Sequence, residues 1–209
     1  MKSLPIILVL LACGCRPQSV GVSPDGDTKN PEISVFLPVD VPSLDDLDGN
    51  SLQAIDPKAK TSVLVFVLSD CPIANSYIPT LNRLYESYKS RGVQMIVVEA
   101  DPKITLGEAR KHAEEFQIGL PVVVDSGHRW VKFAMAKRTP EAVVFSPRGE
   151  ILYRGRIDDQ YVGFGKRRME VTTHELNDAL EAVLNDRPVP NPVTEAIGCY
   201  IPDLTREGK

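Results

Sequence analysis

Apolar residues fall into two alternating patterns from about residue 33 onward. Short unbroken apolar runs, such as residues 63–68, are typical of strands that are buried on both faces of a sheet. Longer stretches carry apolar residues at helical spacing, and two of them open on a Thr followed three residues later by a Glu, the capping-box pattern. The predicted strands are 63–68, 95–98, 121–125, 141–146 and 151–155. The predicted helices are 73–91, 105–116, 127–136 and 172–184, with capping boxes at Thr105–Glu108 and Thr172–Glu175.

This order of elements predicts an α/β fold with a central mixed sheet flanked by helices. The first three strands alternate with helices and are expected to be parallel, because parallel strands need a long crossover connection. The last two are expected to form an antiparallel hairpin through a tight turn at 146–149. A small N-terminal hairpin is expected within 33–60, and the Pro-rich stretch from Asp186 predicts an extended C-terminal tail.

The first 15 residues, MKSLPIILVLLACGC, have the organisation of a bacterial signal peptide. Their apolar run is too short to cross a bilayer. It ends in Leu10-Leu11-Ala12-Cys13, which resembles the lipobox of bacterial lipoproteins and implies that Cys13 becomes lipid-modified. Lipidation at Cys15 and a plain secretory signal are the alternatives. All three predict a protein of the cell envelope or periplasm, and a lipid on Cys13 would anchor it to the membrane.

The rest of the chain is predicted to consist of three segments. Residues 16–31 are polar and rich in Pro, Gly, Ser and Asp, which is typical of a flexible tether. Residues 32–185 form the folded domain, and residues 186–209 form the tail, which carries Cys199. The total length of 209 residues suits one domain with additional segments at its ends.

Composition and charge exclude several functions. The chain has 24 Lys and Arg against 28 Asp and Glu, a net charge of −4, so nucleic acid is not expected as a partner. Three scattered His and few Cys give no pattern typical of a zinc or haem site, so no metal and no cofactor are predicted. His112 is expected to be structural, and His128 and His174 are expected to be exposed near helix starts.

Cys71 is the candidate for chemistry. It lies between a predicted buried strand and a predicted helix, and unpaired N–H groups at a helix N-terminus lower a thiol pKa. Pro72 suits the first turn of that helix. The neighbouring Asp70 would raise the pKa of the thiol, so the net direction is open at this stage.

Residues 33–185 resemble the thioredoxin-like superfamily, in particular the extracytoplasmic redoxins of the alkyl hydroperoxide reductase/thiol-specific antioxidant (AhpC/TSA) type. Cys71 stands at the position of the family's first cysteine, and Pro79 matches a proline inside the following helix. Thr139-Pro140 precedes a strand, as the family's cis-proline does, and 94–125 match the insertion of redoxins. The resemblance implies a thioredoxin-like fold, a cis bond before Pro140, and a loop at Thr139 and Pro140 that faces Cys71 and binds substrate backbone.

The chain also departs from the family's patterns. Ala74 replaces the second cysteine of Cys-x-x-Cys, so Cys71 has no local resolving partner. Leu68 and Leu64 replace the hydroxyl residue and the proline that precede the cysteine in peroxiredoxins, which argues against efficient peroxide reduction. Asn75 removes the Cys-x-x-x-Cys of copper-delivery relatives.

Cys199 is the remaining cysteine outside the N-terminal pair, and the tail is long enough to bring it to Cys71. The apolar residues around it, Ile197, Tyr200 and Ile201, are expected to dock on the domain. A resolving cysteine and a structural disulfide that fastens the tail remain equal alternatives. Arg138, next to Thr139, is a candidate for stabilising the thiolate, and the Lys166-Arg167-Arg168 run is expected in a loop.

Three functions follow in order of preference. The first is a redoxin that exchanges thiols and disulfides, or weakly reduces peroxides, with Cys71 as the nucleophile and Cys199 as the resolving cysteine. Its catalytic residues would be Cys71, Cys199, Thr139, Pro140 and Arg138, and its partners would be protein thiols or disulfides, or small peroxides. The second is a thioredoxin-fold binding module, and the third is a structural envelope lipoprotein with a permanent Cys71–Cys199 bridge.

Overall fold

A computed structural model describes residues 43–204. The predicted signal peptide at 1–15, including Cys13, and the predicted tether at 16–31 lie outside the described residues. The strands in chain order are β1 (Leu44–Asp45), β2 (Ser51–Leu52), β3 (Thr61–Val67), β4 (Val93–Glu99), β5 (Val122–Val124), β6 (Arg138–Thr139), β7 (Glu141–Phe145), β8 (Ile151–Gly155), β9 (Tyr161–Gly163), β10 (Lys166–Arg167) and β11 (Cys199–Tyr200). The helices are α1 (Pro72–Tyr88), a short 3-10 helix (Lys89–Arg91), α2 (Leu106–Glu115), α3 (Arg129–Ala134) and α4 (Glu175–Leu184).

The central sheet has five strands in the order β5-β4-β3-β7-β8. β3 pairs in parallel with β4, and β4 with β5, whereas β3–β7 and β7–β8 are antiparallel. This confirms the mixed sheet and the C-terminal hairpin that the pattern predicts. β3 lies in the middle, and all seven of its residues are buried, as its unbroken apolar run requires.

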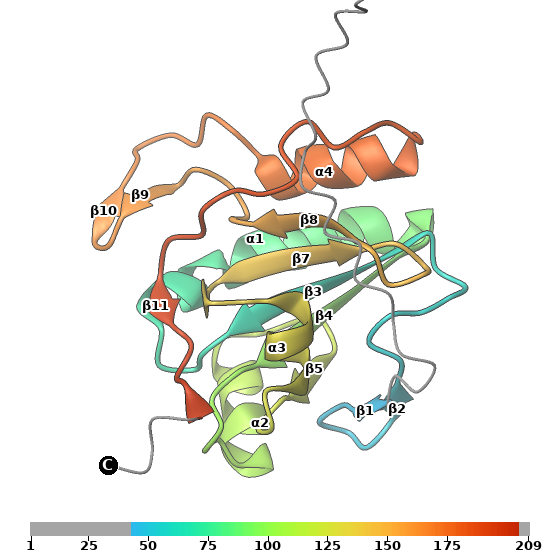
Figure 1. Cartoon of the computed structure of the whole chain (residues 1–209). Coiled ribbons are helices and arrows are strands. Elements are labelled where there is room, and N and C mark those ends of the chain that lie inside the picture. Colours follow the sequence, from blue (N-terminus) through green and yellow to red (C-terminus); the bar gives the residue numbers. More distant parts are fainter. Residues whose placement is uncertain (1–42, 205–209) are drawn as a thin grey trace, which may run out of the picture. The chain divides into compact units, whose positions relative to one another are not determined.

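Helices cover both faces of this sheet (Figure 1). α1 and α4 share a face, because the Tyr88 hydroxyl donates to Asn177 and Glu181 of α4, each at 2.8 Å. α3 lies on the other face, where Phe133 stacks on Phe145 of β7 with ring centroids 5.7 Å apart. No helix within residues 43–204 combines the length and the hydropathy that a bilayer crossing requires.

The two ends of the described chain also follow the predictions. β1 and β2 form the expected small antiparallel hairpin, in which Asp46 accepts the backbone N–H groups of Asp48 and Asn50. After α4 the tail is extended and runs past β8, where Val193 forms a parallel bridge with Arg154, before it reaches β11 (Figure 1).

The two predicted capping boxes have different outcomes. The capping box at Thr105 and Glu108 is present at the start of α2. The second box is wrong: His174 is the N-cap of α4, and Thr172 instead donates its backbone N–H and its hydroxyl to Asp159. A buried carboxylate such as Asp159 demands partners, and Thr172 supplies two of them.

Two further expectations are corrected. The basic run at 166–168 does not lie in a loop, since Lys166 and Arg167 form β10 and pair with β9 in a hairpin. His174 is exposed as expected, but the prediction for His128 is wrong. His128 is buried, and its Nε2 forms a hydrogen bond with the Ala100 carbonyl at 2.7 Å, which satisfies the ring inside the protein.

Candidate active site at the junction of β3, α1 and the tail

Cys71 is placed by the junction of the central strand and the first helix. It is the N-cap residue of α1, with Pro72 in the first helical turn. Its backbone N–H closes a turn onto the Leu68 carbonyl at 3.0 Å, and its side chain has no solvent-exposed area. The thiol donates a hydrogen bond to the Thr139 carbonyl at 3.2 Å. The sulfur is therefore held at the positive end of a helix but is shielded from solvent.

The Thr139–Pro140 peptide bond is cis, which confirms the prediction. Thr139 ends β6 and is fully buried, and its carbonyl is the group that Cys71 contacts. The Thr139 hydroxyl is also buried and has no hydrogen-bond partner among the described residues when the thiol is neutral. The loop before β7 thus faces Cys71 with a carbonyl and an unused hydroxyl.

The tail brings Cys199 to the same place. β11 pairs with β6 in an antiparallel two-stranded sheet in which Cys199 is opposite Thr139 and Tyr200 is opposite Arg138. Because Thr139 stands opposite Cys199 and its carbonyl accepts a hydrogen bond from the Cys71 thiol, the two cysteines, both free, meet at Thr139. The tail therefore brings Cys199 to the residue that Cys71 contacts, as the sequence predicts.

The approach of the tail to β6 depends on a glycine. A Cβ atom on Gly198 would lie 1.8 Å from the Thr139 carbonyl oxygen and 2.7 Å from its carbon, far inside van der Waals contact. The tail is also attached upstream: the Thr194 backbone N–H donates to the Arg154 carbonyl at 3.0 Å, and the Thr194 hydroxyl contacts the Tyr153 hydroxyl at 2.7 Å. We call residues Gly198–Tyr200 the tail strand.

Arg138 holds the tail strand. Its guanidinium donates to the Gly198 carbonyl at 3.3 Å and to the Tyr200 hydroxyl at 2.7 Å, and it stacks 4.1 Å from the centroid of the Tyr200 ring. The sequence suggested a contact with the thiolate, but the structure directs the guanidinium to the tail. The expectation that Tyr200 is buried is wrong, since it is 70% exposed and its ring covers Arg138 rather than the core.

The two thiols differ in acidity. Burial alone would raise the pKa of Cys71, but hydrogen bonds from the Cys199 thiol, the Thr139 side chain and the Ala74 backbone outweigh it, so the pKa is lowered. Burial and the neighbouring Cys71 raise the pKa of Cys199 to about 12. Cys71 is therefore the sulfur that ionises first, and Cys199 stays protonated and donates to it.

A partly buried polar network adjoins Cys71, and we call its four residues, Ser69, Asn75, Glu99 and His112, the floor network. His112 Nδ1 contacts Glu99, and its Nε2 lies 2.9 Å from the Asn75 side-chain oxygen. The Asn75 amide nitrogen donates to the Ser69 carbonyl at 2.8 Å, which fixes the loop before Cys71. In this orientation the Asn75 side-chain oxygen can only accept, so His112 Nε2 is the donor in their contact.

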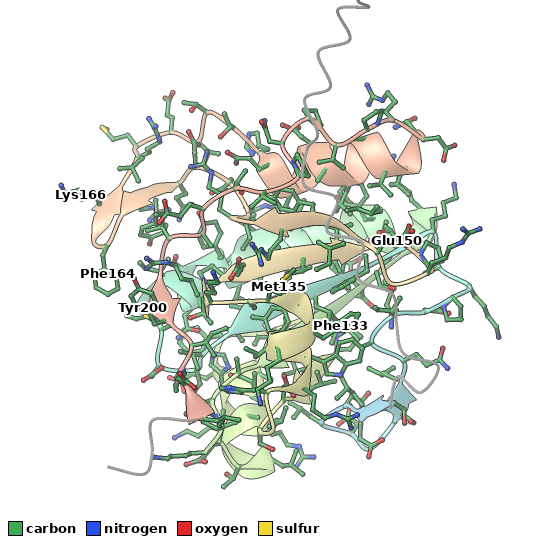
Figure 2. All side chains as sticks on the ribbon, in the orientation of Figure 1. Phe133, Met135, Glu150, Phe164, Lys166 and Tyr200 are labelled. Atoms are coloured by element: carbon green, nitrogen blue, oxygen red, sulfur yellow. The ribbon has the colours of Figure 1, made fainter. Side chains whose placement is uncertain are left out.

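The β9–β10 hairpin borders the site through α1. The Tyr161 hydroxyl lies 3.0 Å from the Ser76 hydroxyl, and the Tyr161 ring is 5.8 Å from the Tyr77 ring. Phe164, at the turn of the hairpin, is 72% exposed, and Figure 2 shows it on the same side of the molecule as Lys166 and Tyr200. The hairpin thus presents an apolar and a cationic side chain on the side of the tail strand.

Within residues 43–204 no cluster of three or more His, Cys, Asp or Glu side chains is arranged to hold a metal ion. The chemistry that the described site can perform is that of its two sulfurs. A low-pKa thiol at a helix N-terminus, a cis-proline loop facing it and a mixed five-stranded sheet together define the thioredoxin-like class.

Comparison with known proteins identifies the family. Residues 38–154, more than half of the chain, match the model of the AhpC/TSA family, and the chain belongs to that family. The match includes Cys71, Thr139 and Pro140 and ends before the tail that carries Cys199.

Individual relatives agree with this assignment. The chain is 27% identical over 122 residues to "Thiol-disulfide oxidoreductase ResA" of Halalkalibacterium halodurans, covering 57% of this chain and 68% of the relative. A conserved, uncharacterised protein of Geobacillus kaustophilus has a similar structure, with a TM-score of 0.67, 26% identity, and coverage of 81% of this chain and 90% of that one. A putative thiol:disulfide interchange protein DsbE of Chlorobium tepidum shares the fold, with a TM-score of 0.55, 18% identity, and coverage of 73% and 98%.

Proposed function

We propose that this protein is an extracytoplasmic thiol–disulfide oxidoreductase that uses Cys71 as its nucleophile and Cys199 as its resolving cysteine. The observation that carries the proposal is the meeting of two free thiols of opposite pKa shift at Thr139. The names of the ResA and DsbE relatives support thiol–disulfide exchange as the reaction. The departures from the family support the pairing, because Ala74 leaves Cys71 without a local partner.

The reaction has two exchange steps in the reducing direction. The Cys71 thiolate attacks one sulfur of a substrate disulfide, which forms a mixed disulfide and releases the first substrate sulfur as a thiolate. Cys199 then loses its proton to solvent or to that leaving thiolate and attacks the Cys71 sulfur. This step forms the Cys71–Cys199 disulfide and releases the second substrate thiol. The substrate gains two electrons, the protein loses two, and an external dithiol must reduce the protein again.

Residues of the loop have separate tasks in this mechanism. The Thr139 hydroxyl, unused while the thiol is neutral, donates to the thiolate and so stabilises the attacking species. Arg138 keeps the tail strand in register with β6, which places Cys199 next to Cys71 for the second step. Leu68 provides no hydroxyl for peroxide, so disulfides are favoured over peroxides as substrates.

The assignment of the two cysteines is tested with 2,2′-dithiodipyridine, a small neutral disulfide, on the reduced full chain. Cys13→Ser/Cys15→Ser serves as background so that only Cys71 and Cys199 react. The background protein is expected to release two pyridinethiones per chain and to form an internal disulfide. Cys199→Ser should release one rapidly and retain a mixed disulfide, whereas Cys71→Ser should react slowly. Rapid reaction of Cys71→Ser would overturn the proposal.

The location is proposed from the N-terminal segment. The apolar run followed by Ala12-Cys13 supports processing as a lipoprotein and attachment to a membrane of the envelope through lipid on Cys13. Replacing Cys13 with Ser should then move the protein from the membrane fraction to the soluble envelope fraction, or block its processing. A wild-type protein that carries no lipid and fractionates as soluble would contradict the anchoring.

A further inference from the structure

The position of the tail strand has a consequence for the substrate. The Cys71 sulfur has no exposed area, and its neighbours apart from the tail belong to the packed core of β3, α1 and β6. Attack on a disulfide requires a substrate sulfur beside the Cys71 sulfur, and the cysteine that stands at Thr139 next to Cys71 in the structure is Cys199. A substrate cysteine must therefore take the place of Cys199.

The tail strand is held in a way that permits exchange for another segment. Its ladder with β6 spans only Cys199–Thr139 and Tyr200–Arg138, and one further bond joins the Ile201 N–H to the Lys137 carbonyl at 3.1 Å. Strand pairing uses main-chain groups, so any extended segment can offer the same bonds to β6. The attachment at Thr194, five residues before Cys199, keeps the tail close when its last part leaves.

We propose that the tail strand occupies the place of the substrate, and that the site prefers a disulfide-bonded cysteine preceded by glycine and followed by an aromatic residue. This inference rests on the proposed function and specifies its substrate class: extended protein segments with the pattern Gly-Cys-aromatic. The tail strand, Gly198-Cys199-Tyr200, is itself the example of such a segment.

The residue before the cysteine is restricted by steric contact with the loop at Thr139 and Pro140. A Cβ atom on Gly198 would lie 1.8 Å from the Thr139 carbonyl oxygen and 3.4 Å from the Pro140 ring. Both groups belong to the buried loop that faces Cys71, so they cannot move aside as a flexible side chain would. A segment that pairs in this register with a branched residue there must shift away from β6, and its sulfur would shift with it.

The position after the cysteine is defined by Arg138. The exposed Tyr200 ring lies over the guanidinium at 4.1 Å, and its hydroxyl accepts a hydrogen bond from the same group at 2.7 Å. Cation–π contacts of this kind favour an aromatic residue over an aliphatic one. Arg138 is thus a residue that determines specificity, and the same contact retains the tail when no substrate is present.

Exchange of strands also couples the chemistry to product release. The substrate segment and the tail strand compete for one edge of β6, so the mixed disulfide forms with the tail strand displaced. When the tail strand returns, Cys199 reaches the Cys71 sulfur and takes over the bond, and the substrate loses its covalent link and its strand pairing together. No separate release step is then needed.

The test uses three peptides, each activated at its cysteine as a 2-pyridyl disulfide, with blocked ends. One has the sequence EAIGCYI of residues 195–201, one has Val in place of Gly, and one has Ala in place of Tyr. They react with the full chain carrying Cys13→Ser/Cys15→Ser/Cys199→Ser, and pyridinethione release gives the rate of mixed-disulfide formation. Relative to the first peptide, the Val peptide should react about tenfold more slowly and the Ala peptide about threefold more slowly.

A second variant separates specificity from general reactivity. Adding Arg138→Gln should bring the rates of the Tyr and Ala peptides together while the preference for Gly over Val persists. Equal rates for all three peptides, alongside rapid reaction with 2,2′-dithiodipyridine, would overturn the inference and leave the proposed function standing. Failure of Cys71 to react with any of these disulfides would instead overturn the proposed function, and the inference with it.

Discussion

Cys71 and Cys199 meet at Thr139 and come from two regions that are held in different ways. The loop that carries Cys71 follows β3, a strand whose residues are all buried, and this loop is fixed by the floor network. Cys199 belongs to β11, a two-residue strand that pairs only with β6 among the described strands, and its neighbour Tyr200 is 70% exposed. Regions with few buried contacts open at lower free-energy cost than core strands. The nucleophile is therefore fixed by the fold, whereas the second cysteine can leave and return without unfolding the domain.

The largest effect is expected from breaking the floor network. His112→Ala removes the partner of the buried Glu99 carboxylate, whose second oxygen already has no partner within the described chain. The free energy of unfolding should fall by about 3 kcal/mol, measured by urea denaturation.

Two control variants make this prediction specific. His174→Ala, at the exposed start of α4, should change the free energy of unfolding by less than about 0.5 kcal/mol. Glu99→Leu/His112→Leu removes both partners and should recover a large part of the loss, because no buried carboxylate is then left unpaired. A His112→Ala protein as stable as the wild type would contradict the role of the floor network.

On the other side of the site, Gly198→Ala should detach the tail strand while leaving the domain folded. The added Cβ would meet the Thr139 carbonyl oxygen at 1.8 Å, and the tail is the part that can move. The rate of Cys71 alkylation by iodoacetamide should rise about tenfold, followed by mass spectrometry of the Cys71 peptide. Gly163→Ala in β9 is the matched control, since its nearest neighbour would be 3.7 Å away. Equal alkylation rates in the two variants would show that the tail strand does not shield Cys71.

A smaller change is expected from Thr139→Val, which keeps the shape of the side chain and removes its hydroxyl. Burial already opposes ionisation of Cys71, and the hydroxyl is one of the hydrogen-bond donors that overcome it. The pKa of Cys71 should rise, measured from thiolate absorbance against pH in the Cys199→Ser background. An unchanged pKa would mean that the α1 backbone stabilises the thiolate without the Thr139 hydroxyl.

The pH dependence of stability in the reduced protein should also differ between the two cysteines. The folded pKa of Cys71 is lowered from 9.0, so its stabilising contribution is present above pH 9 and is lost as pH falls through the folded pKa. The folded pKa of Cys199 is raised from 9.0 to about 12, so its contribution is present below pH 9 and is lost as pH rises toward 12.

Urea denaturation of the reduced protein at several pH values checks both contributions. The difference in unfolding free energy between wild type and Cys71→Ser should increase between pH 6 and pH 9. The difference between wild type and Cys199→Ser should decrease above pH 9. Parallel profiles for the two variants would contradict the opposite shifts of the two thiols.

The scaffold of the site was predictable from the sequence because it depends on local patterns. The unbroken apolar run of β3 identifies the central strand, and the strand-to-helix junction identifies Cys71. The cis bond before Pro140 followed from the order of motifs that resembles the redoxin family.

Features that depend on distant contacts were not predictable in the same way. The floor network joins Asn75 to Glu99 and His112 across three elements, and these residue types have no spacing that indicates a site. The helix start was predicted at Thr172 instead of His174, because Asp159, 13 residues earlier in the chain, binds Thr172 outside the helix. β11 is two residues long and exists only through its partner β6, so no pattern within the tail predicts it.

The reduction potential of the Cys71–Cys199 disulfide separates a catalytic pair from a permanent bridge most directly. The protein would be equilibrated in glutathione and dithiothreitol redox buffers, and the fraction of the Cys71–Cys199 peptide would be mapped by mass spectrometry. If the tail strand leaves and returns during turnover, we expect a reversible disulfide. Its reduction potential should lie between about −270 and −120 mV, the range of thiol–disulfide oxidoreductases. A disulfide that persists below about −300 mV, as structural bridges do, or one that never forms, would contradict the proposed pair.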